Sequence, residues 1–568
     1  MEQTKNLIVA VVMATLVLFA WQYFYEQPLV VEKQKQIHAT KETKGETSLM
    51  SVNENAGSHT TSLSREEVVD SNTRIRIKSS ALEGSISLIG ARIDDLTLPK
   101  YLVATDVDSK PVTLLSPAKT KNAYFVEFGW LANTDLDLPN SNTRWQADQD
   151  ILTANSKALL SWTNKQGIKF MIEFYLDGEY MFSVRQIVAN SSSQTIAYYN
   201  YGLINRVEED NQKFFISHEG PIGVFNAILH EINYDDIKKN KKEEFKDNTS
   251  GSWFGISDKY WLTAIIPDTT KSFDSNFGYN FVDGRDRYQV DYISQKQILA
   301  PGETDSYDLH FFVGAKVLSI LDYYEKYFKL DLFDRAIDFG WFYFITKPMF
   351  KALQYFYAVL GNFGLSILMV TIIVKIVLFP LANKSYQSMS KMKTLQPQIN
   401  RIRDLHVNDK MQQNKEIMEL YKRERVNPLS GCLPLIVQIP IFFSLYKVLF
   451  VTIEMRHAPF YGWIHDLSAP DPTSIFNLFG LLPWQPPALL MLGVWPIIMA
   501  ITMYIQQLLN PQPADPVQAK MMKLLPAVFL FMFSSFPAGL VIYWAWSNTL
   551  SIAQQWLIQI KSKSKTVI

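Results

Sequence analysis

The stretch Gly364–Leu381 reads GLSILMVTIIVKIVLFPL and is apolar except for one charged residue, Lys375. As a helix it is long enough to cross the hydrocarbon layer of a bilayer. A charge at that depth costs roughly 2.5 to 3.5 kcal/mol on insertion scales, so such a side chain usually faces protein or water. We therefore expect the function to centre on Lys375. The alternative is an ammonium that extends along its stem to the nearby membrane surface and has no function.

Apolar residues are unevenly distributed along the chain. The long apolar runs lie between residues 350 and 560, whereas residues 25–330 are polar with short alternating runs. The formal net charge is zero, so composition gives no support for nucleic-acid binding. The only cysteine, Cys432, leaves the polar half without a disulfide of its own. The sequence therefore predicts a multi-domain protein, in which an α-helical membrane bundle is joined to a mainly-β soluble domain.

Six apolar runs are expected to cross the membrane. Residues 1–25 form the first, an uncleaved anchor, because the bulky residues around Phe19 do not resemble a signal-peptidase site. The others belong to a core at 358–560. The expected spans are Leu7–Phe24, Ala358–Leu381, Leu433–Ile453, Ala488–Ile505, the short Leu524–Phe536, and Gly539–Leu557.

The orientation of the spans follows from the basic residues of the connecting loops, which favour the cytoplasm. Residues 383–425 hold ten basic residues, whereas the loop after the third span holds only Arg456. Both termini, including a basic tail at 561–568, are then cytoplasmic, and the large domain is external. In a bacterium the protein would lie in the inner membrane and this domain would be periplasmic.

The external part is expected to comprise a linker and a β domain. Residues 26–72 are dominated by polar and charged side chains, which predicts a flexible linker. Alternating or aromatic runs separated by turn signals predict an antiparallel β-sandwich at 73–330. These runs are Thr73–Lys78, Tyr124–Trp130, Ile168–Leu176, Met181–Val188, Trp261–Ile266 and Leu309–Val313.

Two features of the external part leave alternatives open. The charge run Lys238–Lys246 is most simply a solvated loop. Large sandwiches often bind sugars in clefts lined by aromatic and carboxylate residues, although core aromatics and surface charges are the simpler interpretation. The residues suited to a sugar site are Trp253, Trp261, Asp258 and His218.

Residues 331–357 show helical periodicity. They predict an amphipathic helix at the outer membrane interface, bent at Pro348. Its expected face comprises Leu332, Ala336, Phe339, Phe342, Tyr343 and Phe350. A helix that caps the β domain is the alternative.

The cytoplasmic loop 383–425 is expected to form two antiparallel helices with a basic outer surface, because apolar residues recur at helical intervals on both sides of Asn408-Asp409. Such a hairpin suits anionic lipid headgroups, ribosomal RNA or acidic client segments. A purely topological role for the charges explains them equally well. The candidate contact residues are Lys391, Lys393, Arg401, Arg403, Lys422 and Arg423.

Polar residues also recur within the expected spans and suggest a wet groove. Thr371 and Lys375 are four apart and share a helical face, and Gln438, Tyr543 and Asn548 lie in other spans. The sequence has no phosphate-binding loop, no HExxH pair and no CxxC cluster. We therefore expect no enzymatic activity, no cofactor and no metal.

Three stretches carry a resemblance to the YidC family of membrane protein insertases, in its Gram-negative form: Asn427–Phe442 (NPLSGCLPLIVQIPIF), Trp463–Ser468 (WIHDLS) and Phe536–Asn548 (FPAGLVIYWAWSN). The resemblance implies a periplasmic β-supersandwich, five core membrane helices, a cytoplasmic hairpin and a groove sealed on the outer side. It places the groove's basic residue at Lys375, where the family commonly has arginine, and Trp544 where it has a second tyrosine. Lysine keeps the charge and loses the planar five-donor fork.

The function expected from this resemblance is insertion of membrane proteins. Polar client segments would enter the groove, and client helices would leave laterally into the inner membrane, alone or with the Sec translocon. The implied partners are nascent membrane proteins, the Sec translocon, membrane lipids and the ribosome, with no small-molecule substrate. Two rivals remain open. A transporter is one, although the spans show no matching halves. A membrane-anchored envelope sensor or sugar-binding protein is the other.

Overall fold

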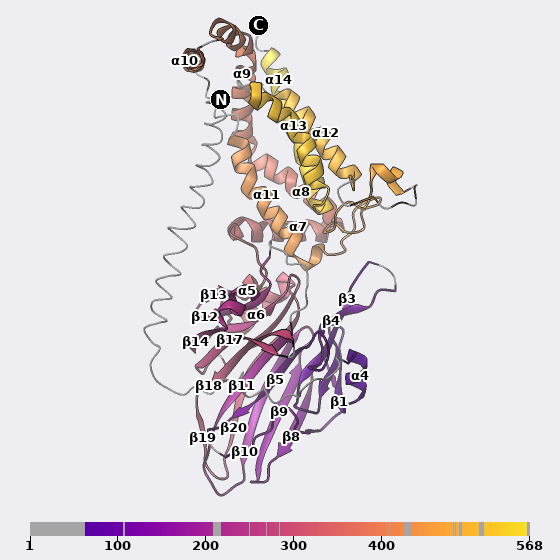
Figure 1. Ribbon diagram of the computed structural model, residues 1–568, viewed down its shortest axis with the longest axis vertical. Helices are drawn as coiled ribbons and strands as arrows, with labels where there is room; N and C mark the ends of the chain where they lie inside the picture. The colour runs from indigo at the N-terminus through magenta and orange to yellow at the C-terminus, as the bar shows by residue number, and fades with distance from the viewer. Residues whose placement is uncertain are drawn as a thin grey trace. The chain divides into compact units, whose positions relative to one another are not determined.

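The computed structural model describes residues 63–564 with short internal gaps. The gaps are 106–107, 134, 208–216, 249, 269, 283, 408, 425, 427–432, 481, 483, 485, 488–490 and 511–515. The expected first span, Leu7–Phe24, and most of the expected linker lie outside the described residues. Strands β1–β20 come first along the chain and helices α7–α14 follow (Figure 1).

The β domain consists of two large, mainly antiparallel sheets. Among the described strands, β1 and β7 pair in parallel. The first sheet has the order β14-β17-β18-β11-β5-β3-β2-β1-β7, with β4 on β3 and β19 on β11. Its strands are β1 (Arg74–Lys78), β2 (Glu83–Ser87), β3 (Ile93–Leu102), β4 (Pro111–Leu115), β5 (Tyr124–Leu131), β7 (Ile151–Thr153), β11 (Ile196–Val207), β14 (Lys242–Asn248), β17 (Phe273–Val282), β18 (Arg285–Ser294) and β19 (Gln297–Leu299).

The second sheet has the order β13-β12-β15-β16-β20-β10-β9-β8-β6. Its strands are β6 (Gln146–Ala147), β8 (Ser156–Thr163), β9 (Ile168–Leu176), β10 (Met181–Asn190), β12 (Gly220–Phe225), β13 (Ile228–Glu231), β15 (Trp253–Ser257), β16 (Trp261–Ile266) and β20 (Thr304–Ala315). All six strand runs expected from the sequence lie in strands.

The core of the β domain lies between the two sheets. The ring of Phe128 on β5 is 6.4 Å from that of Phe174 on β9 and 6.1 Å from that of Phe311 on β20. Alternate residues of β9 are buried, as expected for a strand with one face on a core. The expected β-sandwich is therefore confirmed.

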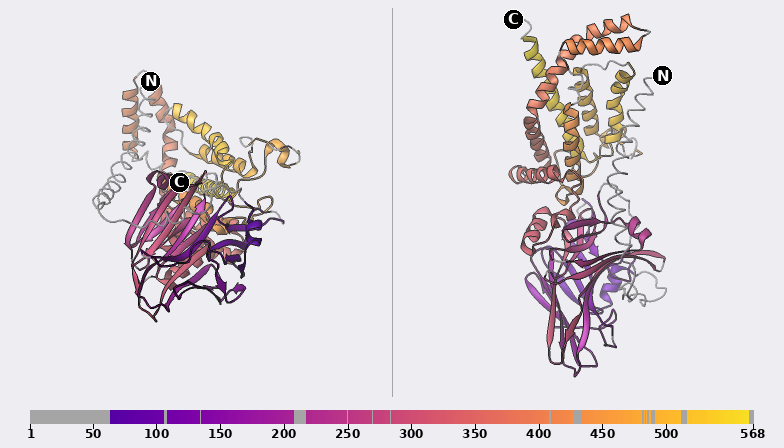
Figure 2. Two further views of the ribbon diagram at one scale, coloured as in Figure 1. Left: turned by 60° about the horizontal axis from the view of Figure 1, so that its bottom comes forward. Right: turned by 90° about the vertical axis from the view of Figure 1, so that its left-hand side faces the viewer.

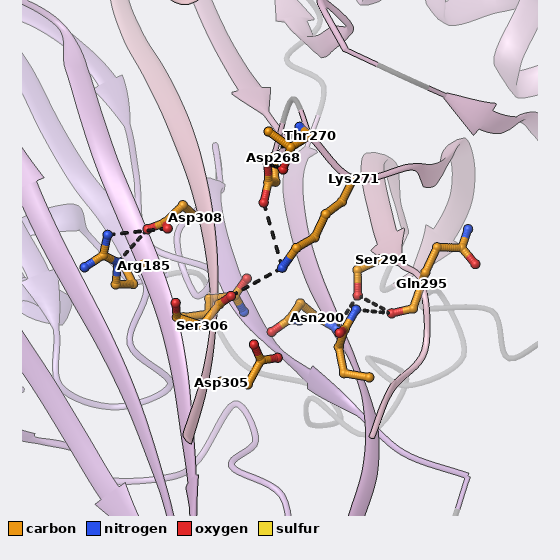
Figure 3. A network of polar contacts seen from close by, with 12 residues as sticks. Arg185, Asn200, Asp268, Thr270, Lys271, Ser294, Gln295, Asp305, Ser306 and Asp308 are labelled. Carbon is orange, nitrogen blue, oxygen red and sulfur yellow. Dashed lines mark hydrogen bonds and ion pairs between the residues drawn. The ribbon is translucent and has the colours of Figure 1, made fainter. Parts of the chain in front are cut away.

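Polar contacts link neighbouring strands and loops of the β domain (Figure 3). Lys271, between β16 and β17, lies 3.4 Å from the carbonyl oxygen of Ser306 and 3.9 Å from Asp268. Arg185 on β10 pairs at 2.6 Å with Asp308 on β20, and both side chains are about half exposed. Exposed pairs of this kind contribute little to stability.

The charge run Lys238–Lys246 forms regular structure, and the prediction of a loop was wrong. Its first part lies in α5 (Tyr234–Asn240) and the rest in β14, which pairs with β17. Phe245 explains the difference, because its ring stacks 4.1 Å from that of Phe225 and anchors the strand to the core.

The folded part begins before the expected boundary at residue 73. Residues 65–70 form α4 (Arg65–Asp70), where Ser64 and Glu67 make a capping box and Val68 is buried. The Ser-x-x-Glu spacing is the sequence signature of such a helix start, which the polar composition had obscured.

The segment 331–357 divides into a cap on the β domain and a helix. After α6 (Leu318–Phe328), the turn η2 (Phe333–Ala336) buries Phe333 against Trp253, with ring centres 5.0 Å apart. Helix α7 (Tyr343–Leu360) starts later and runs through Pro348. The prediction of a single amphipathic helix over the whole segment was therefore wrong. The first third of the segment caps the β domain, which was the alternative interpretation.

The helical part continues with α8 (Phe363–Val377), α9 (Phe379–Leu405), α10 (Lys410–Arg423), α11 (Leu433–Val451), η4 (Ile453–Met455), η5 (Ile475–Gly480), α12 (Val494–Leu509), α13 (Pro516–Phe533) and α14 (Ala538–Ser564) (Figure 2). Within the described residues, no helix taken singly has both the length and the apolar composition of a membrane span, whereas α8 and α9 together, bent by 67°, meet both criteria. The count of six spans stays a prediction.

One end of the helical part is organised by the segment after α11. The side-chain amide of Asn362, at the start of α8, donates to Pro459 O at 3.4 Å. The backbone N–H of Gly539, at the start of α14, donates to Leu467 O at 3.0 Å. Arg456 in turn donates to the carbonyl oxygen of Leu102 on β3 at 2.6 Å. This end of the helices is therefore the end that contacts the β domain.

A groove around Lys375

Lys375 lies in the last turn of α8, directly before the bend into α9. The start of α8 is fixed by Asn362, whose side chain accepts a hydrogen bond from the backbone N–H of Leu365 at 3.1 Å. At 1.5 Å per residue, Lys375 is about 16 Å along the helix from Gly364. The cation therefore lies far from the end that contacts the β domain.

The ammonium of Lys375 is held by two neutral side chains on two other helices. It donates to Ser551 Oγ on α14 at 2.9 Å and to Gln438 Oε1 on α11 at 3.5 Å. The amide nitrogen of Gln438 donates to the hydroxyl of Tyr543 on α14. Lys375 therefore joins α8, α11 and α14 through one chain of hydrogen bonds and does not extend toward a surface.

The contacts from α14 come from residues at four-residue spacing. Tyr543, Ser547 and Ser551 follow one helical face, and the hydroxyl of Ser551 donates to Ser547 O at 2.9 Å while it accepts from Lys375. Because its proton is committed to that carbonyl, Ser551 presents a lone pair to the ammonium. The sequence analysis did not single out Ser551, although its distance of eight residues from Tyr543 was a usable signal.

A pocket opens beside Lys375 at the bend between α8 and α9. It is lined by Lys375, Leu378, Leu381, Ala382, Tyr386, Val437, Gln438 and Gln554. The side-chain nitrogen of Gln554 is buried and has no hydrogen-bond partner among the described residues. An amide donor and an ammonium therefore line the same small, mostly apolar space.

The electrostatic setting of Lys375 suits a bound acceptor. Across the part of the chain that the structure describes, no carboxylate lies within ion-pairing distance of its ammonium. Hydrogen bonds to neutral groups compensate a buried charge only in part. A carboxylate or carbonyl oxygen entering the pocket would complete the coordination of the ammonium.

The remaining groove candidates point elsewhere. Thr371 is only 2% exposed, and its hydroxyl donates to Ile367 O at 2.6 Å. Trp544 joins an aromatic cluster in which its ring lies 4.7 Å from Phe442 and 4.8 Å from Phe533. Asn548 donates to Thr502 on α12 at 3.3 Å. These three side chains position the helices around the pocket and are not among its lining residues.

The other end of α8 is closely packed. A Cβ atom on Gly364 would lie 1.9 Å from a ring carbon of Phe460, so only glycine allows the ring to pack there. The ring of Phe460 also lies 6.2 Å from that of Trp495 at the start of α12. The helices are therefore packed tightly at the end near the β domain, and the pocket beside Lys375 lies toward the opposite end.

An ion pair links α11 to the segment that caps the β domain. Lys447 lies 2.7 Å from Asp338, which also accepts from the backbone N–H of His218 at 3.0 Å. Burial alone would raise the pKa of Asp338, yet its pKa is lowered because these donors stabilise the carboxylate. Asp338 therefore stays charged and holds α11 against the capping segment.

The expected hairpin is formed by α9 and α10 around a core of Met392, Leu395, Ile399, Ile417, Leu420 and Val426. Most of its candidate contact residues are exposed, namely Lys391, Lys393, Arg401, Lys422 and Arg423, whereas Arg403 is half-buried. Lys393 approaches Leu508 O at 3.5 Å, which links the hairpin to α12. The basic outer surface is thus available for anionic partners.

Known proteins resemble the chain over nearly its whole length. The model of the family described as 60Kd inner membrane protein matches residues 355–565, and that of the YidC periplasmic domain matches residues 74–352. The membrane protein insertase YidC of Rickettsia bellii is 52% identical over 555 residues, covering 97% of this chain and 98% of the relative. The namesake in Rickettsia felis is 52% identical over 556 residues with the same coverage. The chain belongs to the YidC family of membrane protein insertases.

Solved structures resemble parts of this YidC-family chain less closely. A crystal structure of an active YidC insertase with its first transmembrane domain resolved is 16% identical, covers 85% of this chain and 92% of its own, and has a TM-score of 0.38. A galactose mutarotase related enzyme from Lactobacillus acidophilus is 8% identical and covers 42% of this chain and 97% of its own, with a TM-score of 0.31.

Membership of the YidC family confirms the resemblance noted in the sequence. The family consists of inner-membrane insertases with a periplasmic domain and not of enzymes. Two of the four residues considered for a sugar site have other roles in the structure. Trp253 is fully buried, and its indole N–H donates to Asp331 O at 2.9 Å. Asp258 pairs with Arg206 at 2.6 Å. The simpler interpretation of core aromatics and paired charges therefore applies to both.

Proposed function

We propose that this protein inserts client proteins into the inner membrane by receiving their polar segments in the groove around Lys375. The helical part would cross the membrane with six spans, including the N-terminal one, with both termini cytoplasmic. The client's apolar helix would leave laterally into lipid, alone or with the Sec translocon. The observation that carries this proposal is an ammonium with only neutral partners, beside an open pocket.

The ligand of the groove is proposed to be an oxygen acceptor of the client. Lys375 and Gln554 supply donors in one pocket, and a client carboxylate or backbone carbonyl matches both. Lysine lacks the fork of arginine, so the amide of Gln554 would provide the second donor of a two-point contact. The groove residues expected from the sequence then divide into a part that faces the ligand and a part that positions the helices. They are Lys375, Thr371, Gln438, Tyr543, Trp544 and Asn548.

The driving force would come from the client. Apolar residues contribute about −0.3 to −0.6 kcal/mol each on insertion scales, so a typical spanning helix gains several kcal/mol on entering lipid. The protein then needs only to lower the barrier for the polar tail, and no nucleotide site is required. The basic hairpin would collect clients, ribosomes or anionic lipids at the cytoplasmic entrance.

The test is insertion into proteoliposomes by the Lys375→Ala variant, with clients that differ only in tail charge. A charge-assisted hydrogen bond contributes about 1.5–3 kcal/mol, so insertion of a client with an acidic tail should fall roughly tenfold or more. A client with a short apolar tail should be affected much less. Lys375→Arg should restore insertion of the acidic client.

The matched control is Lys165→Ala, which removes an exposed cation from the turn between β8 and β9, away from the pocket and the hairpin. It should leave both clients nearly unaffected. If Lys375→Ala inserts both client classes as well as the natural chain does, the charge at position 375 has no part in the mechanism.

A further inference from the structure

The segment between α11 and α12 is strongly apolar. From Pro472 to Ala514 the sequence contains no Asp, Glu, Lys, Arg or His. Within it, the orange segment between α11 and α12 in Figure 1 contains η5 (Ile475–Gly480). We call residues 475–484 the apolar loop and refer only to its described side chains.

The described side chains of the apolar loop are large and exposed. Between 38% and 54% of the surface of each is accessible, for Ile475, Phe476, Leu478, Phe479, Leu482 and Trp484. Soluble surfaces rarely present so many large apolar side chains in one short stretch. The exposed apolar residues of the β domain, such as Phe281 and Ile298, are instead scattered singly.

The backbone of the apolar loop is specifically folded. Phe479 N donates to Ser474 O at 2.8 Å, and Leu482 N donates to Asn477 O at 3.1 Å. Leu478 and Phe479 have φ values of 50° and 59°, a left-handed conformation that bulky side chains rarely adopt. The structure therefore holds two consecutive large apolar residues outward at the expense of backbone strain.

A buried carboxylate fixes the loop to one end of the helices. Asp471 accepts hydrogen bonds from Trp463 Nε1 at 3.1 Å, from Thr473 N at 3.0 Å and from Trp495 N at 2.9 Å. Trp495 begins α12, and the segment before Asp471 contacts the starts of α8 and α14. The same end contacts the β domain through Arg456, so in a YidC-family protein the loop lies on the periplasmic side of the inner membrane.

We propose that the apolar loop inserts into the outer leaflet of the inner membrane, with Phe476, Leu478 and Phe479 among the acyl chains. A lipid surface fits because the whole stretch lacks charge, and the interface is where tryptophans such as Trp484 are enriched. The strained turn places the adjacent side chains of Leu478 and Phe479 so that both can enter the acyl-chain region. This inference is independent of the groove around Lys375.

The test measures the depth of the loop in proteoliposomes. The variant Phe479→Cys, in a Cys432→Ser background, carries an environment-sensitive fluorophore, and Ile298→Cys on β19 is the matched control because its side chain is 68% exposed. With iodide on both sides of the membrane, quenching at position 479 should be several-fold weaker than at position 298. Lipids with a nitroxide on the upper acyl chain should quench position 479 and not position 298.

Two results would overturn the inference. Iodide quenching at position 479 equal to that at position 298 would show that the loop is in water. Protection from iodide without quenching by lipid nitroxides would show that protein, such as a second copy, covers it. If Phe479→Cys does not fold, Trp484→Cys, at another exposed position of the apolar loop, replaces it with the same expected outcomes.

Discussion

Arg74 in the β domain and Lys375 in the helical part are two cations with different kinds of partner. Arg74 on β1 forms an ion pair with Asp94, in which the side chains are only 5% and 7% exposed, and donates to Ser85 Oγ at 2.7 Å. Lys375 on α8 contacts only the neutral Ser551 and Gln438. A buried ion pair already neutralises its cation, whereas a cation with neutral partners keeps its charge available for an anion. In the proposed mechanism, the charge of Arg74 serves stability and the charge of Lys375 serves ligand binding.

The largest predicted effect comes from removing each cation. Arg74→Met leaves the Asp94 carboxylate buried and unpaired, so local stability of the β domain should fall by about 3–5 kcal/mol. Lys375→Met leaves no opposite charge unpaired, so the free energy of unfolding should stay unchanged or rise. Hydrogen exchange of the β1 and α8 peptides in the purified full chain measures both.

The control for this prediction is the double variant Arg74→Met with Asp94→Leu. It removes both charges and should recover most of the loss. A loss of stability in Lys375→Met as large as that in Arg74→Met would contradict the comparison.

Asp291 sharpens the comparison, because it is a buried acid of the β domain whose partners are neutral amides. Gln289 Nε2 donates to it at 2.8 Å and Asn276 Nδ2 at 3.4 Å. Burial raises the pKa of Asp291 from 3.8 to about 6. The folded state then binds the proton more tightly than the unfolded state, so stability is lost as the pH rises from about 4 to 6.

The variant Asp291→Asn cannot ionise and should lack this loss. The difference corresponds to roughly 2.4 kcal/mol between pH 4 and pH 7, in favour of the variant at pH 7. Hydrogen exchange of the β18 peptide at both pH values measures it. Parallel stability profiles for the two proteins would show that the carboxyl titrates normally.

The smallest effect concerns Ser551, the residue that positions the ammonium of Lys375. Ser551→Ala removes one hydrogen bond of about 0.5–1.5 kcal/mol, so insertion of an acidic-tailed client should fall roughly two- to tenfold. Ser551→Thr keeps the hydroxyl and should restore insertion. If Ser551 had only a structural role, Ser551→Ala would lower insertion of apolar-tailed clients equally. That result would count against a role of Ser551 in positioning the ammonium of Lys375.

The fold was predictable where periodicity was strong. The expected run Ile168–Leu176 coincides with β9, because alternation over a half-buried sheet is a local signal. The run Trp261–Ile266 coincides with β16, where every residue after Trp261 is buried, as a short apolar run predicts. Lys238–Lys246 failed because a single aromatic residue, Phe245, outweighs its charged neighbours through contacts distant in sequence. The break between α8 and α9 was also missed, since Leu378 has the same apolar character as the residues around it.

The site was predictable only in part. Lys375 and Gln438 were identified because a charge or amide in an apolar run is conspicuous, and the structure brings them together with Tyr543. Ser551 was missed although its spacing of eight residues from Tyr543 was a usable signal, and Gln554 was missed because a glutamine carries no distinctive signal without its neighbours in space. Trp544 and Asn548 share the same helix but face other neighbours, which helical spacing relative to Tyr543 would have revealed.

The most direct test of the central claim is water access at position 375. The variant Lys375→Cys, in a Cys432→Ser background, is treated with a membrane-impermeant thiol reagent in vesicles of each orientation, with Lys391→Cys on the hairpin as the exposed reference. We expect labelling of position 375 from the cytoplasmic face and none from the periplasmic face. A thiol at position 375 that is unlabelled from both faces, while position 391 reacts, would contradict this expectation.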